Sequence, residues 1–246
     1  NLSRIMLESL IIIYINTKLT YKRYKMRILK ITLIAVISSV LMVLPSNAVE
    51  KRLGISASFI GVSADGTETQ KDSSKKSNTE ASETGVIPSI FAEISTDGGL
   101  GLGVEYVPGT ADINSAARSR SDDDEETTGD NKASADIDGL TSVYIIKTFE
   151  SGLFFKVGQT STTVNTTEVL ATGSKYGNVD IDGTVLSIGV DRTTDNGMFF
   201  RVSGEYTDYD DISLTSQTAD AVTGTKNKID ATLDTAQIKL AIGKAF

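Results

Sequence analysis

The sequence of 246 residues contains no cysteine, no histidine and no tryptophan. Without cysteine the chain has no disulfide framework and no thiol nucleophile. Without histidine it lacks the side chain that most often serves as general base and as metal ligand. These absences argue against a disulfide scaffold, against thiol chemistry and against the commonest kinds of catalytic and metal site.

Aromatic residues are also sparse, at 7% of the chain, whereas glycine, serine and threonine are abundant. Such a composition builds a poor soluble core, because few large side chains are available to fill it. It suits a barrel, whose interior tolerates small and polar side chains.

The net charge of −8 is unevenly distributed. Residues 1–48 hold seven of the 24 basic side chains and one of the 32 acidic ones, so the remainder has 17 basic and 31 acidic side chains, a net charge of −14. An acidic chain of this kind is a poor candidate for binding nucleic acid through its phosphates.

Residues 26–48 have a basic start, an apolar run and a small-residue end, the order that is typical of a cleaved signal peptide. The apolar run, 31–44, is too short to span a bilayer as a helix, which takes about 20 residues. We expect cleavage after Ala48, which leaves 49–246 as the mature chain, and we interpret 1–25 as a misassigned upstream extension.

From Arg52 onward, short stretches alternate apolar and polar residues with a period of two, which indicates β-strands. Tight glycine turns separate some of these stretches, at 97–99, 150–152 and 195–197. Long polar connections, interpreted as loops, separate the others, at 63–85, 108–135, 162–178 and 207–230. Short and long connections alternate strictly along eight strands, a pattern that favours an up-and-down barrel with its short turns on one side of a membrane.

An internal repeat supports the same interpretation. The segments that begin at Asp136 and at Asp180 each contain Asp-Ile-Asp-Gly, a strand, a glycine turn and an apolar-aromatic-aromatic-basic-Val sequence. A repeat of this kind indicates an architecture that uses one supersecondary unit several times. Here the unit is a hairpin.

Most of the expected strands have one charged face and one aliphatic face. A basic side chain that faces lipid at the bilayer midplane costs about 2–4 kcal/mol, so we expect the charged face to line the lumen. The fourth strand is ambiguous, because Val143 and Ile145 on one face balance Leu140, Tyr144 and Ile146 on the other. The expected lumen charge network consists of Glu93, Glu105, Lys156, Asp191, Arg201, Glu205 and Lys239.

Two interpretations of this network are open. Eight strands leave an interior just wide enough for side chains to fill, so paired charges would plug the barrel. The same charges could instead line a gated polar pore.

An acidic run in the second long connection is a weak candidate for a cation site. Its residues are Asp122, Asp123, Asp124, Glu125 and Glu126. The run lacks the ligand order of a calcium-binding loop. We interpret it as a solvated loop tip, with loose cation bridging to anionic lipid head groups as an intermediate possibility.

The last stretch, 235–246, places Ile238, Leu240 and Ile242 on one face and ends on Phe246. It resembles the closing strand of bacterial outer-membrane barrels, in which a terminal phenylalanine is read by the barrel-assembly machinery. Lys244, third from the end, departs from that pattern, which usually has an aromatic or aliphatic residue there.

With the signal peptide, the eight strands and the sorted connections, segment 49–246 is similar to the small eight-stranded outer-membrane β-barrel proteins of Gram-negative bacteria, the porin-like outer membrane protein beta-barrel family. The resemblance implies an all-β fold, an eight-stranded antiparallel up-and-down transmembrane β-barrel with short periplasmic turns and long extracellular loops.

It also implies a monomer in the bacterial outer membrane, in contact with lipids and lipopolysaccharide, that has a structural or porin-like role and binds no nucleic acid. Enzymes among the relatives of this family rely on histidine, so we expect no enzymatic activity and no cofactor here. The alternative is a secreted, lipocalin-like soluble barrel that binds a small apolar ligand. It requires the reverse polarity, apolar inside and charged outside.

Overall fold

The computed structural model describes residues 49–69, 76–108, 110–114, 118–120, 129–169, 174–219 and 224–246. The expected upstream extension and signal peptide lie outside these ranges. Within them, no helix has both the length and the hydropathy that crossing a bilayer requires.

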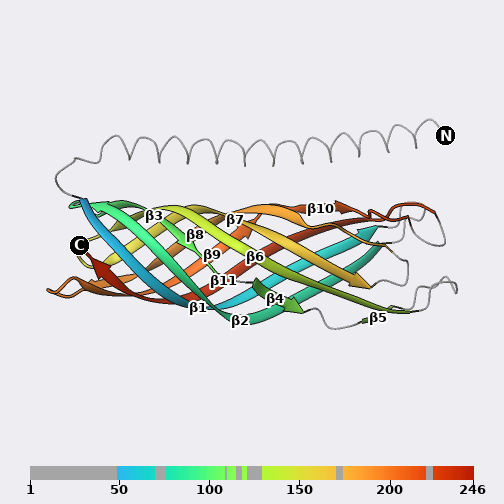
Figure 1. Ribbon diagram of the computed structural model, residues 1–246, viewed down its shortest axis with the longest axis horizontal. Coiled ribbons are helices and arrows are strands. Elements are labelled where there is room, and N and C mark those ends of the chain that lie inside the picture. Colours follow the sequence, from blue (N-terminus) through green and yellow to red (C-terminus); the bar gives the residue numbers. More distant parts are fainter. Residues whose placement is uncertain are drawn as a thin grey trace, which may run out of the picture. The chain divides into compact units, whose positions relative to one another are not determined.

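Eleven strands are present in the described ranges (Figure 1). They are β1 (Val49–Thr69), β2 (Lys76–Thr96), β3 (Leu100–Tyr106), β4 (Thr110–Asn114), β5 (Arg118–Arg120), β6 (Gly129–Thr148), β7 (Leu153–Val169), β8 (Val179–Thr193), β9 (Met198–Tyr209), β10 (Ile212–Thr215) and β11 (Lys228–Ala245). All pairings between them are antiparallel.

The strands form a closed wall with eight strand positions. Neighbours follow the order β1-β2-β3-β6-β7-β8-β9-β11, and β1 pairs with β11 to close the circle. The short strands β4 and β5 continue β3 along β6, and β10 continues β9 along β11. Closure leaves none of the eight long positions as an edge strand, because each is paired on both sides. The expected eight-stranded antiparallel barrel is confirmed.

Three tight turns lie at one end of the barrel, which we call the turn end. Each contains a glycine with positive φ: Gly99 at 73°, Gly152 at 83° and Gly197 at 80°. Glycine adopts this backbone region without a steric penalty. At the same end the main chains of Lys51 and Phe246 exchange two hydrogen bonds of 3.2 and 2.9 Å. The side-chain amine of Lys244 bonds to the carbonyl of Asn196 in the third turn.

The long polar connections are the main correction to the sequence analysis, because their described residues lie largely in strands. In the first of them, β1 continues to Thr69 and β2 begins at Lys76, so most of the expected loop is a paired hairpin. The others contain β4, β5 and the start of β6, the end of β7, and β10 with the start of β11. Strand pairing uses backbone groups, so polar residues rich in threonine and serine extend the wall as readily as aliphatic ones.

The polarity of the wall inverts along its length. Near the turn end, β8 directs Leu186, Ile188 and Val190 outward and Ser187 and Asp191 inward. From Val185 back to Val179 the polarity is the opposite: the outward residues of this strand are polar, and the inward residues, such as Ile181, are apolar. We call the part with an apolar exterior the girdle half and the part beyond it the extended half.

The girdle half carries exposed aliphatic and aromatic side chains from strands all round the barrel. They include Leu53, Ile55, Ile90, Val104, Val143, Phe155, Leu186, Val202, Leu240 and Ile242. The ambiguous fourth strand is resolved in β6, since Val143 is 43% exposed whereas Tyr144 and Ile146 are 1% and 2% exposed.

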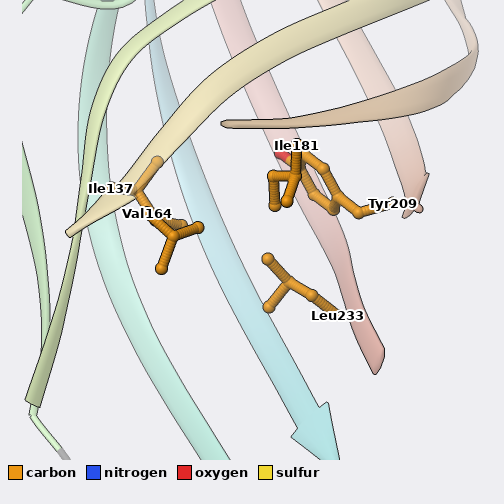
Figure 2. Packing of buried hydrophobic residues seen from close by; sticks show 5 residues of the cluster. All are labelled: Ile137, Val164, Ile181, Tyr209 and Leu233. Carbon is orange, nitrogen blue, oxygen red and sulfur yellow. The ribbon is translucent and has the colours of Figure 1, made fainter. Parts of the chain in front are cut away.

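The extended half has its own apolar core inside the barrel. Figure 2 shows Ile137, Val164, Ile181, Tyr209 and Leu233, which come from β6, β7, β8, β9 and β11 and pack as one buried cluster. Val62, Ala64, Val179 and Ile212 pack against this apolar cluster.

Candidate functional site

The lumen of the girdle half is filled by charged side chains. All seven residues of the expected lumen charge network are buried, between 4% and 8% exposed. The structure adds an eighth, Arg52 of β1, whose side chain is 12% exposed. The neighbours of these residues along each strand, such as Phe200 and Val202 beside Arg201, face outward in the girdle. The eight charges form two groups of four.

The first group, the arginine quartet, contains Arg52, Arg201, Glu93 and Asp191. The guanidinium of Arg201 donates to both carboxylate oxygens of Glu93, at 2.6 and 2.8 Å. Its Nε donates to Asp191 Oδ2 at 3.0 Å, and Arg52 Nη1 donates to the same oxygen at 2.9 Å. Arg201 lies directly across from Asp191 in the ladder of β8 and β9, so the backbone register brings this pair together.

Aromatic rings surround the arginine quartet. The Arg201 guanidinium lies 4.8 Å from the ring centroid of Phe154 and 5.5 Å from that of Phe91. Phe199 lies 5.6 Å from Arg201 and 5.2 Å from Arg52 and is fully buried. Aromatic faces attract cations and exclude water, so the rings strengthen the ion pairs that they surround.

The second group, the lysine quartet, contains Lys156, Lys239, Glu105 and Glu205. Lys239 Nζ donates to Glu105 Oε1 at 2.6 Å and to Glu205 Oε1 at 3.1 Å. Lys156 Nζ lies 3.3 Å from Glu105 Oε2 and also pairs with Glu205 Oε2. Each lysine therefore contacts both carboxylates, which makes a closed ring of ion pairs. Ser89 adds a hydrogen bond of 2.6 Å to Glu105.

Tyr144 connects the two quartets. Its hydroxyl donates to Glu93 Oε1 at 2.8 Å, and the amine of Lys156 lies 4.6 Å from its ring centroid. Gly103 of β3 pairs with Glu93 of β2 on one side and with Tyr144 of β6 on the other, so it lies between these two residues. A Cβ at position 103 would clash with the Tyr144 ring, so the glycine provides the space through which the hydroxyl reaches the carboxylate.

Each quartet has two positive and two negative charges and is therefore neutral. Removal of charges from water is costly unless they are paired and hydrogen-bonded, and these quartets meet both conditions. Such an arrangement can fill and cross-link the lumen. It leaves no charged group of either quartet without an opposite charge in contact with it.

The space left in the lumen of the described barrel is small. A cavity of about 20 Å³ lies between the lysine quartet and the apolar cluster, with Glu205, Gln237, Thr160 and Tyr209 in its lining. This volume holds about one water molecule. A much larger hollow of about 1000 Å³ is lined mostly by outward residues such as Phe59, Leu186 and Ile238, which places most of it at the outer wall of the girdle. Four inward residues also contribute to its lining: Lys156, Ser187, Glu205 and Gln237.

Sequence reasoning missed Arg52 and the role of Tyr144. Arg52 has the same strand parity as Gly54 and Ser56, the polar face of the first strand, so alternation could have identified it. Tyr144 could not be identified, because the facing of its strand was ambiguous.

The acidic candidates Asp122, Asp123, Asp124, Glu125 and Glu126 lie outside the described residues. Among the residues that are described, no cluster of three or more acidic side chains is arranged to hold a metal ion. Phe246, the expected assembly signal, is 70% exposed on the outside of the turn end.

No protein-family model and no curated protein matches the chain. Solved structures do match. The outer membrane protein OprG from Pseudomonas aeruginosa superposes with a TM-score of 0.57 at 14% identity, over 81% of this chain and 96% of that one. Ail of Yersinia pestis gives a TM-score of 0.37 at 9% identity, over 81% and 99%, and Neisserial surface protein A gives 0.36 at 11%, over 80% and 97%. The last two scores are too low to support an argument. The match to OprG shows that this chain has the fold of an outer-membrane β-barrel.

Proposed function

We propose that this chain, which has the fold of a bacterial outer-membrane β-barrel, is a structural protein of the outer membrane whose lumen is closed rather than conducting. The observation that carries the proposal is the pair of neutral quartets in the girdle half. They occupy the lumen at the level where the exterior is apolar, which is the level of the bilayer core.

A conducting pore needs a continuous path for water and ions. The cavity beside the lysine quartet in the described lumen has room for about one water molecule. Beyond this cavity the apolar cluster closes the extended half, and an apolar constriction opposes the passage of ions. Conduction would require rearrangement of two ion-pair rings and of the apolar cluster.

We further propose that the protein is not an enzyme and needs no cofactor. An active site depends on titratable groups that are available to a substrate. In the girdle lumen the carboxylates and amines are occupied by one another. The chain also has neither histidine nor cysteine.

We infer that the turn end faces the periplasm and the extended half projects from the cell. Outer-membrane barrels have short periplasmic turns and longer segments outside. The outward residues of the extended half, such as Asp180, Thr232 and Asp234, suit water rather than lipid. The partners are then outer-membrane lipids, lipopolysaccharide and the barrel-assembly machinery, with a monomer as the working unit.

Two measurements test the proposal. Residues 49–246, refolded in detergent, should migrate differently on a denaturing gel before and after boiling, as a folded membrane barrel does. In planar bilayers the same preparation should give no steady conductance, with a known porin as positive control. Steady conductance that persists at constant voltage would contradict the closed lumen and favour the gated pore.

The alternative, a secreted lipocalin-like barrel, is favoured by one observation, the apolar interior and polar exterior of the extended half. The girdle half opposes it, since its exterior would expose a continuous apolar surface to water. A chain that folds as a monomer without detergent or lipid, and that shows no gel shift, would support the soluble barrel.

A further inference from the structure

The hollow at the outer wall of the girdle half follows two rows of residues that run across six strands. In a row, each residue is the ladder partner of the next, from β6 through β7, β8, β9 and β11 to β1. The first row consists of Lys147, Phe155, Ile188, Gly204, Ile238 and Phe59. A second row runs beside it from Ile145 to Gly61. Both rows line the hollow, so it is a groove that crosses the strands, and we call it the wall groove.

Small residues form the floor of the wall groove. Gly204 lies in the first row, and Ala236 and Gly61 are adjacent in the second. A Cβ at position 204 would meet no atom within 4 Å. The ladder partners of Gly204 are Ile188 and Ile238, whose side chains are 50% and 62% exposed. The groove therefore exists because side chains are missing between larger apolar ones.

The wall groove rises from the turn end into the girdle half. Lys147 is the last residue but one of β6, whereas Phe59 lies in the middle of β1. Neighbouring strands are about 4.8 Å apart, so a row across six strands is about 24 Å long. Strands of outer-membrane barrels tilt by about 40°, so such a row rises by about 15 Å along the barrel axis. This is half of the hydrocarbon core of about 30 Å, the depth of one leaflet.

The two ends of the wall groove differ in charge. At the turn end, the amine of Lys147 donates to the carbonyl of Gly98 and lies 5.6 Å from the ring centroid of Phe149. Within the described ranges no carboxylate forms an ion pair with Lys147. A lysine amine has three donors, so it can still bind an anion. On the side away from the turn end, the row that borders the groove contains the paired residues Asp208 and Asp234.

We propose that the wall groove binds one phospholipid from the leaflet at the turn end. Its phosphate contacts Lys147, and one acyl chain follows the first row toward Phe59. A lipid from the opposite leaflet would place its phosphate near the carboxylates of Asp208 and Asp234, which repel it. The volume of about 1000 Å³ is at the upper end of ordinary ligand sites, which measure about 300–1,000 Å³. This inference rests on the proposed function, because only a barrel in the membrane presents its girdle to lipid.

Native mass spectrometry tests the site. The chain is expressed in full, purified from outer membranes in a mild detergent, and titrated with dipalmitoyl phosphatidylglycerol. Dipalmitoylglycerol, which has the same chains and no phosphate, is titrated separately. The protein should retain one molecule of the phospholipid and bind it more tightly than the diacylglycerol.

Two substitutions separate the head-group contact from the groove. Lys147→Ala should lower the affinity for the phospholipid by about tenfold, through loss of hydrogen bonds to a charged group, and leave that for the diacylglycerol unchanged. Lys147→Arg should restore it. Gly204→Leu fills the groove and should lower the affinity for both lipids. The controls are Lys51→Ala, which removes another lysine at the turn end, and Ala92→Leu, which adds the same side chain on β2. Neither position lines the groove, and neither substitution should change the affinities.

Equal retention by the unchanged protein, Lys147→Ala and Gly204→Leu would overturn the site and show only the lipid that surrounds any barrel. A dimer that Gly204→Leu dissociates would also overturn it, with a second copy of the chain as the occupant. Tighter binding of lipid A than of phosphatidylglycerol would overturn the assignment to the turn-end leaflet. Loss of the gel shift on boiling would contradict the proposed function instead, so the two failures are distinguishable. The same shift verifies that each variant is folded, and if Lys147→Ala does not fold, Gly204→Leu decides.

Discussion

The girdle half and the extended half of this barrel share the same strands but have opposite polarity. On β11, the outward residues Leu240 and Ile238 give way to Asp234 and Thr232. The inward residues change in the opposite sense, from Lys239 to Leu233. The backbone ladder with β1 continues through the change without a break in register.

This difference shows that the ladder and the polarity of the wall are independent. Ladder hydrogen bonds involve backbone groups and are indifferent to which face is apolar. The medium outside the wall decides which face is apolar. Apolar side chains point outward where lipid surrounds the barrel and inward where water surrounds it. The extended half is thus organised like a soluble barrel built on the end of a membrane barrel.

The interiors differ in how they are held together. The girdle half is held by directional ion pairs that need their partners, whereas the extended half is held by the packing of Ile137, Val164, Ile181, Tyr209 and Leu233. Loss of one member should therefore have different consequences in the two halves. Four pairs of substitutions test the differences between the two halves, and each can be measured by urea unfolding in lipid, followed by circular dichroism and tyrosine fluorescence.

The largest effect is expected for Arg201→Ala. The substitution leaves Glu93 and Asp191 buried with little compensating charge, and breaking a buried pair in this way costs about 3–5 kcal/mol. The matched control is Arg192→Ala on the same barrel, an exposed arginine that should change the unfolding free energy little. Similar effects of the two substitutions would mean that the arginine quartet contributes no more than a surface contact.

Leu233→Ala should destabilise the extended half by about 2–4 kcal/mol, because it leaves a cavity inside the apolar cluster. Leu240→Ala is the control on the same strand. Its side chain faces outward and is 58% exposed, so lipid fills the space that it leaves and the loss should be clearly smaller. Equal losses would contradict the assignment of the cluster as a core.

The inversion of the outer wall is tested by arginine on one face of β11. Leu240→Arg places the charge in the apolar girdle and should cost about 2–4 kcal/mol, whereas a charge outside the lipid costs about 0–1 kcal/mol. Thr232→Arg is the second case, eight positions along the same face. If both substitutions cost the same, the boundary between the two halves does not coincide with the edge of the bilayer.

The smallest effect is expected for Gly103→Ala, at about 1–3 kcal/mol for an overpacked site. The added methyl group would displace the Tyr144 ring and weaken its bond to Glu93. Gly204→Ala is the control in the same half, since an added Cβ there meets no atom within 4 Å. If Gly204→Ala lowered the unfolding free energy as much as Gly103→Ala, the cause would be the lost backbone freedom of glycine and not the displacement of Tyr144.

Alternation along the strands was sufficient to predict the girdle half. A period of two separates two faces, and the cost of charges in lipid assigns the charged face to the lumen. The same rule places Lys156, Arg201 and Lys239 in the lumen, where the structure has them buried. Alternation is insufficient for β6, because both of its faces carry apolar residues. Only the neighbouring strands determine that the side chain of Tyr144 points into the lumen.

The extended half departs from the sequence-based prediction, because polar composition predicts loops where the structure has strands. Segments such as 63–69 and 76–85 have few aliphatic residues, and a local window contains no information about their partners. In the closed wall each of these segments lies beside a neighbouring strand and pairs with it. The pairing uses backbone hydrogen bonds and does not require apolar side chains. Polar composition therefore marked the limit of the girdle rather than the end of the barrel.

By itself, the sequence determined the strand period, the glycine turns and the separation of charged and aliphatic faces, because these depend on residues that are neighbours in the chain. The tertiary structure decided which charges meet. Arg52 and Asp191 are 139 positions apart, and Lys239 and Glu105 are 134 apart. Only closure of the barrel by β1 and β11 brings such residues into one lumen, where their ion pairs and the apolar cluster can form.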